Sequence, residues 1–89
     1  MIIAVKKCVA VFKSRTQVMS FVEFMKSQGV QCKLIATPKE AHVGCGVSAE
    51  FPQIKLNLAK HVVNSIGFSA FVGFFLIEKH GTHTTVVRI

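Results

Sequence analysis

The amino-acid sequence predicts a single α+β domain over residues 1–89, a ferredoxin-like βαββαβ two-layer sandwich with an additional C-terminal strand. Two stretches repeat apolar residues at helical spacing, and stretches rich in β-branched and apolar residues alternate with them in that order. With 51% hydrophobic and only 17% charged residues, the chain of 89 residues can fill one core and is too apolar for a disordered segment. We expect one domain without a linker.

The first strand is expected over residues 5–13, followed by a helix that begins at Ser14. Ser14 and Gln17 have the spacing of a capping box, in which the two side chains satisfy free backbone N–H groups at the helix start. Gly29 is predicted to end this helix, because glycine adopts the left-handed cap conformation most easily. The side chains predicted to be buried are Val18, Phe21, Val22 and Met25.

A second strand is expected over residues 30–36 and a third over residues 47–51, with a loop over residues 39–46 between them. Thr37 and Pro38 close the second strand, since the proline ring blocks further pairing. Pro52 is predicted to lie in the first turn of the second helix.

The second helix should bury one apolar stripe and end at Gly67. Its stripe consists of Ala59, Val62, Val63 and Ile66. A long apolar strand is expected over residues 68–79, and His80 and Gly81 are predicted to form a two-residue turn into a last strand over residues 83–89.

Both faces of the sheet are predicted to be apolar. The first strand offers Val5, Val9 and Val11 on one face and Cys8, Ala10 and Phe12 on the other. The strand over residues 68–79 is expected to place Phe71, Phe75 and Ile77 opposite Val72, Phe74 and Leu76. Because helices cover only one face, we expect a homodimer or higher oligomer through the other.

The net charge of +7 and the pI of 9.8 would suit a nucleic-acid partner, but the lysines and arginines are scattered in runs of two at most. We therefore favour a role in solubility and do not expect nucleic-acid binding. RNA stacking on sheet aromatics also lacks support, since residues 47–51 hold only one aromatic side chain. No secretory signal or membrane-spanning stretch is expected, and the three cysteines are expected to be reduced, which suits a cytoplasmic protein.

The most reactive side chain is predicted to be Cys45, between Gly44 and Gly46. The topology should bring residues 37–46 to the end of the sheet where the first helix begins. The positive end of that helix, together with Arg15, Lys39 and His42, would favour an accessible thiolate. Cys8 and Cys32 lie inside predicted strands and are expected to be buried.

Residues 9–78 resemble the family of small selenium/sulfur carrier-like domains. The similarity rests on Lys33–Glu40 and on Cys45–Phe51. It implies that Cys45 is the carrier thiol, that sulfur or selenium donor and acceptor proteins are the partners, and that no cofactor is needed. The family's turn has an arginine where this chain has Lys39, and Lys39 cannot make the bidentate contact of a guanidinium. The residues expected to bind around the thiol are Arg15, Thr16, Thr37, Pro38, Lys39, His42, Gly44 and Gly46.

Other functions are weighed against this one. His42 with Cys45, or His80 with His83, has ligand-like residue types, but two ligands are too few for a metal site and none is predicted. An enzyme is not expected, because the chain has no aspartate and no motif that sets a base beside a nucleophile. The alternative is a homo-oligomeric structural or regulatory interaction domain in which Cys45 has no role.

Overall fold

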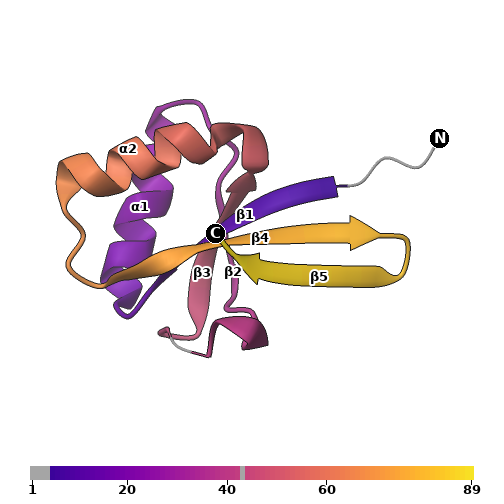
Figure 1. Cartoon of the computed structure of the whole chain (residues 1–89). Coiled ribbons are helices and arrows are strands. Elements are labelled where there is room, and N and C mark those ends of the chain that lie inside the picture. Colours follow the sequence, from indigo (N-terminus) through magenta and orange to yellow (C-terminus); the bar gives the residue numbers. More distant parts are fainter. Residues whose placement is uncertain (1–4, 43) are drawn as a thin grey trace.

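The computed structural model describes residues 5–42 and 44–89. The described residues form two α-helices and a five-stranded sheet. Figure 1 shows the helices on one side of the sheet. The strands run antiparallel to their neighbours in the order β2-β3-β1-β4-β5, which confirms the α+β class. The elements are β1 (Val5–Phe12), α1 (Arg15–Ser27), β2 (Lys33–Ala36), β3 (Val47–Pro52), α2 (Leu56–Ile66), β4 (Phe71–His80) and β5 (His83–Arg88). Short 3-10 turns span Lys39–Ala41 and Gln53–Lys55.

Helix α1 begins at the predicted cap, where the Gln17 backbone N–H donates to Ser14 Oγ at 3.3 Å. The second half of the predicted capping box takes a different course. The Gln17 side chain accepts from the Ala70 backbone N–H at 2.9 Å and donates to Ser69 Oγ at 3.0 Å, so it fastens the start of α1 to the segment before β4. The buried side chains of the helix are the four predicted ones, Val18, Phe21, Val22 and Met25.

The end of α1 explains why β2 is shorter than predicted. Gly29, with φ of 79°, donates to the Lys26 carbonyl at 2.9 Å, and the Val30 N–H donates to the Met25 carbonyl at 3.1 Å. These are the two hydrogen bonds of a Schellman motif, and the side chain of Val30 is buried, as such a cap favours. The chain therefore stays with the helix through Val30, and pairing with β3 begins only at Lys33.

The second helix begins later than predicted and buries three of its four expected residues. Pro52 is the last residue of β3, and a 3-10 turn separates it from α2. Ala59, Val62 and Val63 are buried, whereas Ile66 is 47% exposed in the last helical position. Gly67 ends the helix as predicted, in the left-handed conformation with φ of 73°.

The sheet is apolar on both faces, as predicted, but its open face is partly covered by the chain itself. The helix-side cluster contains four buried phenylalanines, Phe12, Phe21, Phe51 and Phe74. On the other face Val9, Val11 and Phe75 pack with Ala41 of the 3-10 turn after β2, and Val9 and Val11 are fully buried within one chain. The centre of this face therefore needs no second copy to exclude water.

Two details of the β4–β5 hairpin differ from the prediction. In the pairing of β1 with β4, Val11 lies opposite Gly73 and Phe12 lies opposite Phe71, so Val72 is the extra residue of a bulge. The bulge exchanges the faces of the sheet on which the β4 side chains before Gly73 lie. Phe71 therefore packs with the helix-side cluster and Val72 with the open-face cluster, the reverse of the expected faces. The hairpin pairs His80 with His83, which makes Gly81 and Thr82 the turn residues.

Candidate functional site

The three cysteines have two kinds of surroundings, as predicted. Cys8 and Cys32 are buried, with 0% and 4% of their surfaces exposed. Burial raises the pKa of both thiols to about 11, and the nearby lysines, Lys60 for Cys8 and Lys26 for Cys32, offset this only in part. Cys45 is half-buried in the loop before β3. It is therefore the thiol that a reagent or partner can reach.

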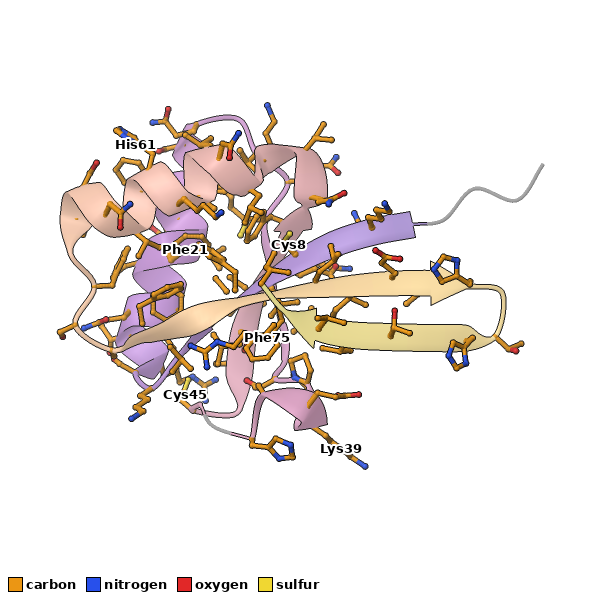
Figure 2. All side chains as sticks on the ribbon, viewed as in Figure 1. Cys8, Phe21, Lys39, Cys45, His61 and Phe75 are labelled. Carbon is orange, nitrogen blue, oxygen red and sulfur yellow. The ribbon has the colours of Figure 1, made fainter. Side chains whose placement is uncertain are left out.

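The backbone of this loop is closed tightly over the end of β1. The Cys45 N–H donates to the Phe12 carbonyl at 3.1 Å. Phe12 is the last residue of β1 and lies two positions before Ser14, the N-cap of α1. Gly44 has φ of 125°, and a Cβ there would lie 3.1 Å from Val11 Cγ1, so the close approach requires glycine. Figure 2 shows Cys45 at the end of the sheet where α1 begins. The topological prediction that placed the loop near the helix start is therefore correct.

The sulfur of Cys45 is less open than the flanking glycines suggested. Its S–H group donates to the Val47 carbonyl at 3.4 Å, and the side chain packs against the helix-side cluster. The thiol is thus held by one weak hydrogen bond and one apolar wall. These two contacts orient the side chain, and the residue as a whole is half-buried.

Most of the predicted binding residues line one shallow depression of about 260 Å³ beside the thiol loop. The lining residues are Thr37, Pro38, Lys39, His42, Gly44 and Gly46. Lys39 supplies a cationic group, and His42 adopts the left-handed conformation with φ of 58°. The depression can therefore receive a small polar or anionic group. Gly44 and Gly46 line it, whereas Cys45 between them does not, because its side chain packs against the helix-side cluster. Arg15 and Thr16, the first two residues of α1, are absent from the lining.

One residue that the sequence analysis missed supports this depression. Ser48 is fully buried, and its hydroxyl lies 2.7 Å from Thr37 Oγ1. The Thr37 N–H also donates to the Gly46 carbonyl at 3.1 Å, so the two sides of the loop are joined by backbone and by side chains. The signal in the sequence was a serine next to the apolar residues Val47 and Ala49 of the predicted strand, and it did not identify Thr37 as the partner.

The described part of the chain contains no group of three or more metal-ligating side chains. His80 Nε2 lies 3.1 Å from a carboxylate oxygen of Glu78, and His83 faces His80 across the hairpin. None of the helices in the described residues is long and apolar enough to cross a bilayer.

Comparison with known proteins gives one match. A family model described as "Putative Se/S carrier protein-like" matches residues 7–71. The match runs from β1 to the first residue of β4, so it includes the Cys45 loop and leaves out β5. No curated protein and no solved structure matches the chain.

Proposed function

The chain belongs to the selenium/sulfur carrier-like family, and from this membership we propose that it accepts a sulfur or selenium atom on Cys45 and passes it to a partner protein. The observation that carries the proposal is the difference among the three thiols. Cys8 and Cys32 are enclosed in the core, whereas Cys45 is half-buried in a loop whose residues Gly44 and Gly46 line a depression with Lys39 on its rim. A carrier needs one thiol that partners can reach.

The loading step is a thiol exchange. The Cys45 thiolate attacks the outer sulfur of a protein persulfide on the donor, forms a Cys45 persulfide, and releases the donor cysteine as a thiolate. One sulfur–sulfur bond forms on Cys45 as one breaks in the donor persulfide, so the exchange consumes no oxidant. A selenium atom would pass in the same way from a donor selenosulfide. Delivery repeats the step with an acceptor nucleophile, which makes the protein a stoichiometric carrier rather than an enzyme.

The depression lined by the two glycines that flank Cys45 would give this exchange electrostatic support. A persulfide anion or a donor thiolate carries negative charge, and Lys39 on the rim of the depression would attract it as a point charge. His42 lies on the same rim and offers a ring N–H as a hydrogen-bond donor. Arg15 and Thr16 would contribute only through the positive end of α1.

The finer predictions on fold, assembly and location belong to the same proposal. The strands β2, β3, β1 and β4, with two helices on one face, support a ferredoxin-like core to which β5 adds an edge strand. A homo-oligomer would have to use apolar side chains that remain exposed near the sheet edges, such as Leu34 on β2 and Val87 on β5. Reduced thiols and exchange chemistry suit a cytoplasmic protein.

Loading with glutathione persulfide tests the proposed carrier role. The reduced protein should gain the mass of one sulfur per chain, on the peptide that contains Cys45, and cyanide should remove it as thiocyanate. Cys45→Ser should abolish the gain, whereas the matched variant Cys32→Ala should keep it. Labelling of Cys8 or Cys32 instead, or loading of Cys45→Ser, would contradict the proposal.

A further inference from the structure

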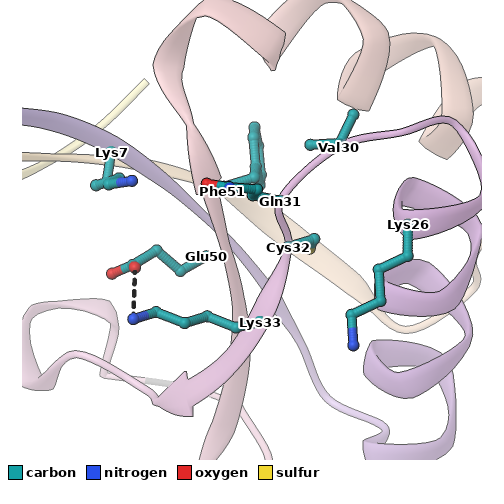
Figure 3. A pocket seen from close by; sticks show the side chains of 8 residues that line it. All are labelled: Lys7, Lys26, Val30, Gln31, Cys32, Lys33, Glu50 and Phe51. Carbon is teal, nitrogen blue, oxygen red and sulfur yellow. Dashed lines mark ion pairs between the residues drawn. The ribbon is translucent and has the colours of Figure 1, made fainter.

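A second cavity of about 390 Å³ lies at the opposite end of β2 from the Cys45 loop. It is enclosed by the segment between α1 and β2, by the end of β3 and by side chains of β1 and α1. Figure 3 shows its lining, with Lys7 and Lys26 on opposite sides. The lining residues are Lys7, Lys26, Val30, Gln31, Cys32, Lys33, Glu50 and Phe51.

The Schellman motif at the end of α1 creates this space. Val30 is tied to Met25 by its backbone N–H, so residues 30–32 stay with the helix and pairing with β3 starts at the Lys33–Glu50 pair. The end of β3, at Phe51, is left without a β2 partner. The gap between residues 30–32 and the end of β3 therefore results from the way in which α1 ends.

The walls of the cavity combine an apolar interior with positive charge. Val30, Cys32 and Phe51 are each at most 5% exposed and form the apolar part. Three lysines and one glutamate supply the charges, and Lys33 Nζ lies 3.7 Å from Glu50 Oε1. Lys7 and Lys26 make no salt bridge with any described residue. The Cys32 thiol stays neutral at pH 7, because burial raises its pKa to about 11.

We propose that this cavity binds a small organic anion with an apolar body, held by Lys26 at its acidic group and by Val30, Cys32 and Phe51 around the apolar part, with Lys7 adding positive charge from the other face of the sheet. The volume is within the range of small-molecule sites, which are mainly apolar with a few polar groups that set orientation. Lys26 is exposed and Lys7 is half-buried, so water solvates both in the free protein, and their charge would favour an anion over a neutral ligand of the same shape. This site is separate from the thiol loop and does not depend on the carrier role.

The fluorescent aromatic sulfonate 8-anilinonaphthalene-1-sulfonate is a suitable probe, because it joins an apolar body to one anionic group. It should bind the full-length protein with one site per chain. Lys7→Gln and Lys26→Gln should each weaken binding about three- to tenfold, as expected for loss of a charge contact worth on the order of 1 kcal/mol. Glu50→Gln should strengthen it about two- to fivefold, because it removes the only acidic group of the lining. Amide NMR shifts should concentrate at Gln31, Lys33 and Phe51.

Lys55→Gln is the matched control, since it lowers the net charge equally at an exposed position outside the cavity. Its affinity for the probe should equal that of the parent protein. Equal weakening by Lys55→Gln would reduce the effect to overall charge and overturn the proposal. So would weaker binding by Glu50→Gln, shifts centred elsewhere, or no binding of the probe to the folded protein.

Discussion

The backbone before strand β2 and the backbone after it are held in different ways, and this difference explains why Cys32 and Cys45 have different surroundings. Before β2, the Schellman motif holds residues 29 and 30 on the helix, and a cavity opens beside Cys32. After β2, the Thr37 N–H continues the pairing to Gly46, and the loop closes over the end of β1. The first arrangement buries a thiol beside a cavity, whereas the second leaves a thiol half-buried in a loop that is hydrogen-bonded to the end of β1.

Thiol modification should give the largest difference between the two ends. We expect Ellman's reagent to react with Cys45 roughly a thousandfold faster than with Cys32 or Cys8, because the buried thiols react only after an opening that costs about 4 kcal/mol. Mass spectrometry of peptides from a reaction time course measures the ratio. In urea, all three should react at similar rates. Fast modification of Cys32 in the folded protein would remove the contrast.

Alkaline pH should destabilise the buried side of the comparison. The pKa of Cys8 and of Cys32 is raised from 9.0 in the unfolded chain to about 11, so the stability that their burial provides is complete below pH 9 and is lost as the pH rises through 11. The loss should reach up to about 2 kcal/mol per thiol. Urea unfolding at pH 7, 9 and 11 measures it.

Cys32→Ala is the control for this pH dependence. The unfolding free energy of this variant at neutral pH should be lower than that of the parent protein. Between pH 9 and 11, however, the variant should lose less unfolding free energy than the parent, because only Cys8 remains as a buried thiol. An identical loss in the two proteins would show that Cys32 does not contribute to the pH dependence.

Substitution of Gly44 should reveal how tightly the thiol loop is packed. A Cβ at Gly44 would lie 3.1 Å from Val11 Cγ1 in a backbone conformation that favours glycine, so Gly44→Ala should cost about 2 kcal/mol of unfolding free energy. Gly46→Ala has the same kind of backbone strain, with φ of 91°, but meets nothing within 4 Å and should cost about 1 kcal/mol. Equal losses in urea unfolding would show that contact with Val11 is unimportant.

The smallest effect is expected at the other end, in the cap of α1. Gly29→Ala should cost about 1 kcal/mol, because alanine pays for the left-handed conformation with φ of 79° but has open space around its Cβ. Thermal unfolding followed by circular dichroism measures the change. Gly81→Ala, in the hairpin turn with φ of 63°, is the matched variant and should lose a similar amount. A gain in stability at Gly29 would contradict the role of the cap.

Local patterns predicted the elements of this fold well, and contacts between elements explain the errors. The stripe from Val18 to Met25 and the stops at Gly29 and Gly67 depend on nearby residues, and the structure has them as predicted. The start of β2 depends on how Val30 packs on α1, and the alternation in β4 depends on a bulge opposite Val11. Neither can be read from the spacing of apolar residues.

The candidate site shows the same limit. Strand order was enough to place Cys45 at the end of the sheet where α1 begins, and six of the eight expected neighbours line one depression. The direction of the sulfur depends on the Val47 carbonyl and on the core beneath it, which the sequence does not reveal. The expected cover for the open face was also available within the chain, because Ala41 packs onto Val9 and Val11.

The side chain of Arg88 binds the end of strand β5 that lies farthest from the hairpin turn to strand β4. Its guanidinium lies over Gly73, where a Cβ would come within 3.0 Å of Nη2, and it donates to the Val72 carbonyl at 2.8 Å. Strand β5 is consequently held at both ends, although it lies outside the family match. Because β5 pairs with β4, the backbone groups along that side of β4 are occupied, and the edge of the sheet that stays open to another extended chain is that of β5 instead.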